Sequence, residues 1–298
     1  MARLHREDST PIFLRSQHVI GRSRAAHTRL QDAEVSSQHA VLTWTTSDWV
    51  VRDLGSRNGT LVNGTQLRPG EERRLALGDV MVLGRTQLTL ASDTPPAPAA
   101  RSGEQLVEGS AELLTLPSEE EPLAIVSCDT TGSWQLILDG RSSPILDGET
   151  VVVAGQPWTL MLPEPATRTA KASRSVHTLD DIALRIQVSS DEEHVEVTVL
   201  VGGEEHLIKP RAHHYLVLTL ARARAADADR PTSEQGWLYT EQLVKMLRIS
   251  SNMLYVSTHR VRKEIEALGI ADASRFIERR APSRQLRLGT ASFEVARM

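Results

Sequence analysis

The stretch DLGSRNGTLVNG, from Asp53 to Gly64, lies between two runs that are rich in β-forming residues. The run WVV precedes it, and LALGDVMVLG follows it. Glycine and asparagine tolerate a positive φ, so the stretch predicts at least a hairpin turn. A glycine-rich loop can also present backbone N–H groups to a phosphate. The neighbouring sequence decides between the two interpretations.

Short β-rich runs separated by turn signals fill residues 11–90. These runs are HVIGRS, HAVLTWT, DWVVRDL, VMVLG and QLTLA, with SRNG, VNG and LRPGEE among the turns. Regular short strands with such turns predict an all-β sandwich or barrel.

Five short motifs occur in order within this β-rich region. They are GRS at 21–23, SSQH at 36–39, GSRNGT at 55–60, NG at 63–64 and GD at 78–79. In this order and spacing they resemble a forkhead-associated (FHA) domain, a β-sandwich that binds phosphothreonine peptides. The resemblance covers about residues 10–92, and we assign the domain to residues 1–92.

The chemistry of the motif residues agrees with a phosphate site. A phosphothreonine carries about −1.5 to −2 charges and three acceptor oxygens, so its site needs a fixed cation and short donors. Arg22 supplies a charged donor fork, and Ser36 a hydroxyl and a backbone N–H. Asn58 can clamp the ligand backbone, and the resemblance implies that Arg57 also meets the phosphate. Ser37 stands where the family often has Arg or Asn, which predicts a weaker contact.

Other residues of the motifs are expected to be scaffold. The resemblance implies that His39 is architectural, because it bonds loop backbone. Gly59 and Asn63-Gly64 suit turns with positive φ, and Asp79 suits a turn carboxylate. Glu34, near the rim, is expected to disfavour acidic residues beside the phosphothreonine.

The middle of the chain shows two linker-like segments around a β-rich region. Proline and alanine dominate residues 93–104, which predicts an extended linker, and residues 165–178 are interpreted as a second one. Residues 105–164 form a small β-rich region of unknown role. Its piece LDGETVVVAGQPWTL weakly echoes the earlier LGDVMVLGRTQLTL. A degenerate duplication is one explanation, but chance similarity of turn–strand pieces is the favoured one.

Residues 179–298 read as a hairpin, a helix, a short helix, a long helix and two strands. We expect Pro210 just inside the first helix, Thr240 to cap the second, and Ser250 or Ser251 to cap the third, which Gly269 ends. This order resembles the winged helix-turn-helix effector domain of response-regulator transcription factors. The match covers about residues 180–290 and is clearest at VRKEIE in the long helix.

The long helix and the wing supply the candidate contacts to DNA. An α-helix fits the major groove, and arginines of a wing suit phosphate or minor-groove contacts. A stripe of Leu254, Thr258, Val261, Ile265 and Leu268 is expected to be buried. The predicted DNA-binding residues are Tyr255, His259, Arg260, Arg262, Lys263, Arg279, Arg280 and Arg284.

Two features of residues 179–298 depart from the pattern of that family, and a third, a histidine pair, does not predict a metal site. Glu264 replaces a lysine that the family expects, and the usual Gly-Tyr of the wing is missing. His213 and His214 are not interpreted as a metal pair, because adjacent helical residues point about 100° apart and no third ligand is evident.

Composition restricts the class of protein. The 298 residues carry a net charge of −4, but residues 101–170 hold 11 acidic and 3 basic residues, and residues 205–298 hold 16 basic and 10 acidic. The basic end suggests a polyanionic partner. The single cysteine excludes a disulfide framework. Without a secretory signal or an apolar run of about 18 residues, we expect a cytoplasmic protein with no membrane contact.

The sequence therefore predicts a multidomain phosphothreonine-dependent transcription regulator with no catalysis, cofactor or metal. Its expected partners are duplex DNA and a phosphothreonine protein, either a Ser/Thr kinase or its substrate. A homodimer is one arrangement through which ligand capture would change DNA occupancy. An adaptor whose winged helix binds protein is the main alternative, and an enzyme accessory subunit is a weaker one.

Overall fold

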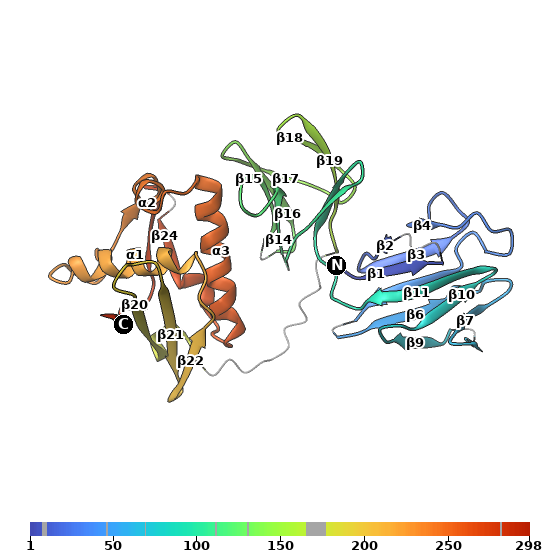
Figure 1. The fold of residues 1–298 in the computed structure, drawn as a ribbon, viewed down its shortest axis with the longest axis horizontal. Helices are drawn as coiled ribbons and strands as arrows, with labels where there is room; N and C mark the ends of the chain where they lie inside the picture. The colour runs from blue at the N-terminus through green and yellow to red at the C-terminus, as the bar shows by residue number, and fades with distance from the viewer. Residues whose placement is uncertain are drawn as a thin grey trace. The chain divides into compact units, whose positions relative to one another are not determined.

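A computed structural model describes residues 1–7, 11–45, 47–68, 70–110, 112–129, 131–164, 177–280 and 282–298. The chain divides into two compact units, Met1–Arg168 and Thr169–Met298 (Figure 1). The predicted linker at 165–178 falls outside the described residues except for His177 and Thr178. No helix among the described residues has both the length and the apolar composition needed to cross a lipid bilayer.

The first sandwich has a six-stranded and a five-stranded sheet around an apolar core that includes Leu42, Trp49 and Leu88. The six-stranded order is β2 (Pro11–Phe13), β1 (Arg3–Arg6), β11 (Thr86–Ser92), β10 (Val80–Leu83), β7 (Thr60–Val62) and β8 (Thr65–Gln66). The five-stranded order is β4 (Thr28–Arg29), β3 (Gln17–Gly21), β5 (Ala40–Trp44), β6 (Trp49–Asp53) and β9 (Glu72–Leu75). The predicted all-β sandwich is confirmed here.

A second, smaller sandwich follows in the same unit and has its own core, which includes Trp134, Val151 and Trp158. One sheet has the order β13 (Gln105–Glu108), β12 (Ala99–Ser102), β19 (Gln156–Met161) and β18 (Thr150–Val153). The other has the order β14 (Leu113–Pro117), β15 (Pro122–Cys128), β16 (Trp134–Leu138) and β17 (Arg141–Pro144). The prediction of a linker at 93–104 is wrong for β12, because small apolar side chains such as Ala99 and Ala100 fit a buried strand.

The second sandwich repeats the strand order of the first. The order β2-β1-β11-β10 corresponds to β13-β12-β19-β18, and β3-β5-β6-β9 corresponds to β14-β15-β16-β17. Every neighbouring pair in these four series is antiparallel. Eight strands therefore match in sequence order, in sheet order and in direction.

The repeat extends to individual hydrogen bonds. The N–H of Gly78 donates to Leu90 O at 2.8 Å, and that of Gly148 donates to Leu160 O at 3.0 Å. The indole of Trp49, at the start of β6, donates to Thr94 O at 3.2 Å. The indole of Trp134, at the start of β16, donates to Pro163 O at 3.0 Å. Chance similarity was therefore the wrong interpretation of the sequence echo, which marks an internal duplication.

The copies differ at one end of the sandwich. Residues 22–39 connect β3 to β5, whereas only residues 118–121 connect β14 to β15. Residues 54–71, which include β7 and β8, connect β6 to β9, whereas a two-residue turn at Asp139-Gly140 connects β16 to β17. The described second sandwich thus has no counterpart of β4, β7 or β8, or of the loops beside them.

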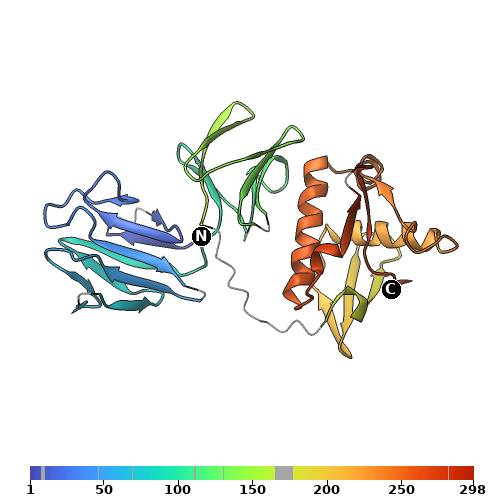
Figure 2. The same cartoon turned by 180° about the vertical axis from the view of Figure 1, so that it is seen from behind.

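The C-terminal unit combines two sheets and three helices around one core (Figures 1 and 2). The four-stranded order is β22 (Glu204–Ile208), β21 (Val195–Val201), β20 (Ile182–Val188) and β26 (Phe293–Arg297). The three-stranded order is β23 (Leu238–Tyr239), β25 (Gln285–Leu288) and β24 (Ile277–Arg280). The helices are α1 (His214–Ala226), α2 (Thr240–Leu247) and α3 (Ser251–Ala267), with single 3-10 turns at Leu179–Asp181 and Ala273–Arg275. The helix α1 packs against β21 and β26, and α3 packs against α1 and α2.

Helix boundaries agree with the sequence in part. Ser250 caps α3, since its hydroxyl accepts the Met253 N–H at 3.1 Å, and Gly269 follows the helix with φ +80°. Thr240 is the first residue of α2 and Tyr239 its cap, one position from the prediction. Pro210 precedes α1 by four residues, so its predicted place inside the helix is wrong. The predicted stripe of α3 is buried from Leu254 to Ile265, and Leu268 packs against the same core.

A carboxylate on α3 joins the two histidines at the start of α1. The Nε2 atoms of His213 and His214 each lie 2.9 Å from one oxygen of Glu264. The sequence showed no third ligand near the pair, and this expectation is wrong, because Glu264 contacts both rings. Glu264 lies 50 residues from His214 in sequence, and His213 precedes the helix, so the sequence did not indicate this contact. The Nδ1 of His214 accepts the Arg211 N–H at 3.3 Å, so its Nε2 carries the proton. That pattern suits a carboxylate clamp, since a metal-bound histidine donates from its other nitrogen.

We predict that Glu264→Gln destabilises the C-terminal unit in a pH-dependent way. Burial raises the pKa of Glu264, but the hydrogen bonds from His213 and His214 outweigh it and lower the pKa from 4.5 to about 2. The ionised clamp is therefore fully stabilising above pH 4.5 and is lost as the pH falls toward about 2. At neutral pH the variant should lose about 2 kcal/mol of unfolding free energy.

The free energy of unfolding of the C-terminal unit can be measured by denaturant titration, with circular dichroism at the helix band as the signal. This signal reports on that unit because all three α-helices described lie in it. Glu234→Gln, at an exposed loop carboxylate, is the control and should leave the free energy unchanged. A difference between Glu264→Gln and the parent that stays constant from pH 7 to pH 3 would rule out the clamp.

Candidate functional site

Two loops at one end of the first sandwich hold the predicted phosphothreonine residues. Backbone hydrogen bonds run from Arg22 N to Ser36 O at 2.9 Å and from Ser23 N to Ser37 O at 3.0 Å. This close approach needs a glycine at position 21, because a Cβ there would lie 2.2 Å from Ser37 O. Arg22 is therefore fixed beside Ser36 although 13 residues separate them in sequence.

Ser36 connects the first loop to the second. Its Oγ accepts the Arg57 N–H at 3.0 Å, which leaves the hydroxyl hydrogen to donate to a ligand. Its backbone N–H donates to His39 Nδ1 at 3.1 Å, so the expectation that this N–H serves the ligand is wrong. Ser37 is exposed beside it, and its carbonyl is used by Ser23.

The remaining predicted side chains keep donors directed to solvent. Arg22 is exposed and uses only Nε within the described structure, donating to Val35 O at 3.3 Å. Its two terminal nitrogens are thus left for a ligand. Asn58 donates from Nδ2 to Glu34 O at 2.8 Å and keeps its carbonyl oxygen and a second N–H. Arg57 is exposed at the tip of the second loop.

The acidic groups near this site are already compensated. Arg85 pairs with Glu34 at 2.8 Å, so the carboxylate expected to repel acidic residues has its own cation. Hydrogen bonds from the N–H groups of Glu34 and Arg85 lower the pKa of Asp32. Arg22 and Arg57 are the exposed cations closest in the hydrogen-bond network to Ser36, through Arg22 N–Ser36 O and Arg57 N–Ser36 Oγ.

A buried histidine holds the loops together, which confirms that His39 is architectural. His39 is fully buried, and its Nδ1 accepts the Ser36 N–H, so its Nε2 carries the proton donated to Gly59 O at 3.0 Å. Sequence reasoning missed the support beneath it, namely Asp53, which accepts from Ser56 Oγ at 2.6 Å and from Thr60 Oγ1 at 2.7 Å. Burial raises the pKa of Asp53, but these hydrogen bonds outweigh it and hold the pKa low. An Asp three residues before a Ser, in a glycine-rich turn, was the available signal.

The second Asn-Gly pair is scaffold, as predicted. Asn63 and Gly64 have φ of +49° and +76° and form the turn between β7 and β8. The Asn63 side chain donates to Asp79 at 2.8 Å and accepts the Val80 N–H at 2.9 Å. Asp79 also accepts the Ala76 N–H at 2.9 Å, so it is a turn carboxylate.

Arg262 and Arg280, both predicted to contact DNA, donate to backbone carbonyls inside the C-terminal unit. Arg262 donates to Ile277 O, and burial lowers its pKa. It ties α3 to β24, and this contact disfavours a role in reading a groove. Arg280 donates to Ser233 O at 2.7 Å and stacks 4.0 Å from the Trp237 ring centroid.

The other predicted contacts fall on α3 and on the β24–β25 hairpin. Arg279 and Arg284 are exposed on the hairpin, and Arg284 adopts φ +50°. Lys263 on α3 forms an ion pair with Glu266 at 2.8 Å. Tyr255, His259 and Arg260 also lie on α3.

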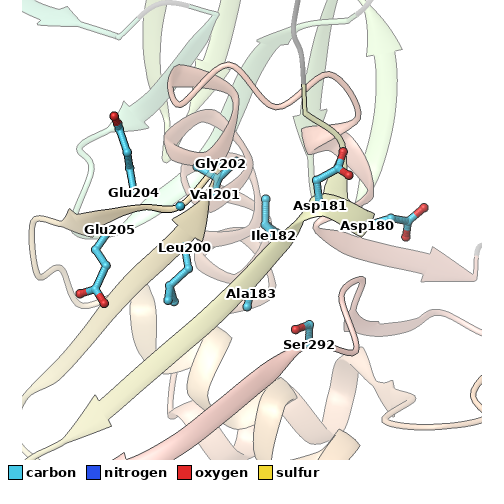
Figure 3. A pocket seen from close by; sticks show the side chains of 11 residues that line it. Asp180, Asp181, Ile182, Ala183, Leu200, Val201, Gly202, Glu204, Glu205 and Ser292 are labelled. Carbon is cyan, nitrogen blue, oxygen red and sulfur yellow. The ribbon is translucent and has the colours of Figure 1, made fainter.

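A pocket of about 330 Å³ opens elsewhere in the C-terminal unit, at one end of the four-stranded sheet (Figure 3). Asp180, Asp181, Glu204 and Glu205 contribute to its lining, and no lysine or arginine does. This acidic lining is unsuited to a phosphate or to DNA.

Comparison with known proteins identifies the first sandwich. A model of the FHA domain matches residues 18–84. An FHA domain-containing protein of Arabidopsis thaliana is 42% identical over 55 residues, which are 18% of this chain and 14% of the relative. FhaA of Mycobacterium tuberculosis is 39% identical over 71 residues, 24% of this chain and 13% of the relative. The similarity thus spans only about one seventh of these relatives.

Solved structures are also similar over this part of the chain. EmbR of Mycobacterium tuberculosis, in complex with a low-affinity phosphopeptide, is 28% identical over 32% of this chain and 25% of its own, with a TM-score of 0.29. A structure determined to study phosphothreonine-dependent FHA interactions is 31% identical over 32% of this chain and 98% of its own, with a TM-score of 0.29. Residues 18–84 of this chain belong to the FHA domain family, whose members bind phosphothreonine.

Proposed function

We propose that the first sandwich captures a phosphothreonine on a partner protein and that this capture regulates DNA binding by the C-terminal unit. The partner is a Ser/Thr kinase or one of its substrates. The observation that carries the first half is that the backbone N–H groups of Arg22 and Arg57, two exposed residues on different loops, both bond to Ser36.

The geometry of these three groups suits a phosphate dianion. Arg22 and Arg57 supply cations on two different loops, and the Ser36 Oγ bond to Arg57 N–H fixes the distance between the loops. Donors held in place by the fold lose little entropy on binding, so each charge-assisted bond can contribute about 1.5–3 kcal/mol. Asn58 is placed to clamp the peptide backbone beside the phosphothreonine, and Ser37 lies at the rim.

We predict that Arg22→Ala weakens binding of phosphothreonine peptides by about 100-fold, because it removes the donor fork but only one hydrogen bond within the described protein. Titration calorimetry with a pool of phosphothreonine peptides of randomised flanks, and the same pool unphosphorylated, measures the change. The parent should bind one peptide per chain, since the second sandwich lacks the equivalent loops.

Arg74→Ala is the matched control, because Arg74 lies on β9, 82% of its side chain is exposed and its one ion pair among the described residues, with Asp48, is long at 3.8 Å. This control should bind as the parent does. Parent-like affinity of a folded Arg22→Ala variant would refute the assignment of the site, and a second bound peptide would refute the single site per chain.

For the output, we propose that the C-terminal unit is a winged helix that binds duplex DNA. The order hairpin, α1, α2, α3 and β24–β25 supports this proposal, with α3 as the helix for the major groove and the hairpin as the wing. Because Arg262 and Arg280 are engaged with backbone carbonyls, the proposal now depends most on Arg279 and Arg284 at the wing.

We predict that the double change Arg279→Ala with Arg284→Ala weakens DNA binding. The negative slope of log K against log salt should become less steep by about 2. Mobility-shift titrations of random-sequence duplexes at several salt concentrations measure this slope. The control is Arg222→Ala. Arg222 lies on α1 and is paired with Glu192, and its removal should leave the slope unchanged.

Absence of DNA binding at low salt by a protein with intact helical circular dichroism would overturn the regulator proposal. That outcome would favour an adaptor whose C-terminal unit binds protein. An unchanged slope for the double variant would place DNA contacts elsewhere on the unit and refute the wing assignment.

A further inference from the structure

The duplication leaves one edge of the second sandwich open. In the first sandwich, β10 pairs on one side with β11 and on the other with β7. In the second, the corresponding strand β18 pairs with β19, and within the described part of the chain no strand covers its other side. Because the second sandwich has no counterpart of β7 or β8, it lacks the second of the two loops and also leaves the outer edge of β18 unpaired within the described residues.

The first sandwich shows which backbone groups of β18 face the open side. Val82 pairs with Leu61 on β7, and Val80 O accepts the Asn63 N–H at 2.9 Å. The β10–β11 and β18–β19 pairings have the same register with every residue shifted by 70, so Val80 and Val82 correspond to Thr150 and Val152. Because alternate residues of a strand point their N–H and C=O to the same side, both groups of Thr150 and Val152 face the open edge.

The edge also exposes apolar side chains, and the strand carries none of the features that discourage pairing with another chain. Val152 is 60% exposed, and Leu146, just before the strand, is 69% exposed. Thr150–Val153 reads TVVV, four β-forming residues without a charge or a proline. Edge strands of monomers usually carry lysine, proline or a bulge, which discourage pairing with another chain.

We propose that β18 is a dimerisation edge, at which the same strand of a second copy of this chain adds in the antiparallel direction. The copies would be related by a two-fold axis at Val151, so that Thr150 of each copy lies opposite Val152 of the other. The two four-stranded sheets then join into one continuous sheet across the axis. This inference does not depend on phosphothreonine or DNA binding.

Three features of this edge are compatible with a second copy of this chain. First, β7 shows that an antiparallel strand is the neighbour that this fold accepts at this edge. Second, the two-fold register pairs every outward residue of β18 with an outward residue of the other copy, which satisfies the groups that the lost strand left open. Third, Glu149 would lie opposite Val153, and Asp147 opposite Gly155, so no like charges face each other.

The strand is short, so the association is expected to be reversible. Four paired residues make an interface smaller than that of a permanent dimer, and we expect half-dimerisation at about 100 µM. Sedimentation velocity of the full chain across that concentration should show a monomer that converts to a dimer.

The decisive variant is Val152→Pro, which removes the N–H that faces the second copy while an edge strand tolerates proline. It should shift half-dimerisation at least 10-fold upward. Val152→Thr keeps the N–H and the β-branched shape and should dimerise as the parent does. Leu77→Lys, at a residue of the first sandwich that is 62% exposed, controls for a charge introduced at an exposed apolar site.

Tryptophan fluorescence during heating will show whether Val152→Pro lowers the melting temperature. If it does, Val152→Lys is the second variant, because it leaves the backbone N–H in place. It should also weaken the dimer, since a lysine on the strand disfavours edge pairing. A parent chain that stays monomeric throughout the range would overturn the proposal. Dimerisation of folded Val152→Pro or Val152→Lys at the parent's concentration would do the same, because the dimer would then use another surface.

Discussion

The fully buried imidazole of His39 is the constraint on which the proposed phosphothreonine site depends. One ring nitrogen accepts from Ser36 N and the other donates to Gly59 O, so a single ring fixes the backbone of both loops. These two hydrogen bonds restrain loops that would otherwise be mobile, because exposed loops have few contacts that fix their geometry. The buried carboxylate of Asp53 strengthens the arrangement by holding the second loop through Ser56 and Thr60.

The second sandwich shows that the core of the fold does not require the loops of this site. Eight strands and the indole bond of Trp134 are retained in the copy, although the loops that carry arginine and serine in the first sandwich are replaced by short connections. The sandwich core and the binding loops are therefore separable parts. A core of paired strands is stabilised by its own apolar contacts, whereas a loop that binds phosphate adds exposed cations that contribute nothing to that core.

The FHA domain was predictable from sequence because its motifs are short and have a fixed order, from Gly21-Arg22 to Asn58-Gly59. Strands with turn signals were predictable for a similar reason, since both are local patterns. Contacts between residues that are distant in sequence were not predictable in this way. Glu264 reaches His213 and His214 across about 50 residues, and Ala99–Ser102 becomes a strand only because β13 and β19 pair with it. The duplication was hidden because strand order is a property of pairing, which a weak echo in sequence does not reveal.

Charge composition is the least reliable of the sequence arguments, and the C-terminal unit shows why. Its excess of basic residues suggested a polyanion partner, yet several arginines bind carbonyl oxygens within the unit. Arg224 is 4% exposed and donates to Thr290 O at 2.9 Å, and Arg287 donates to Thr232 O at 2.8 Å and to Glu278. A guanidinium has five donors, so it can join strands and helices through carbonyls that lack other partners. The charge that matters for a nucleic acid is thus the charge of exposed groups such as Arg279, and not the net charge of the segment.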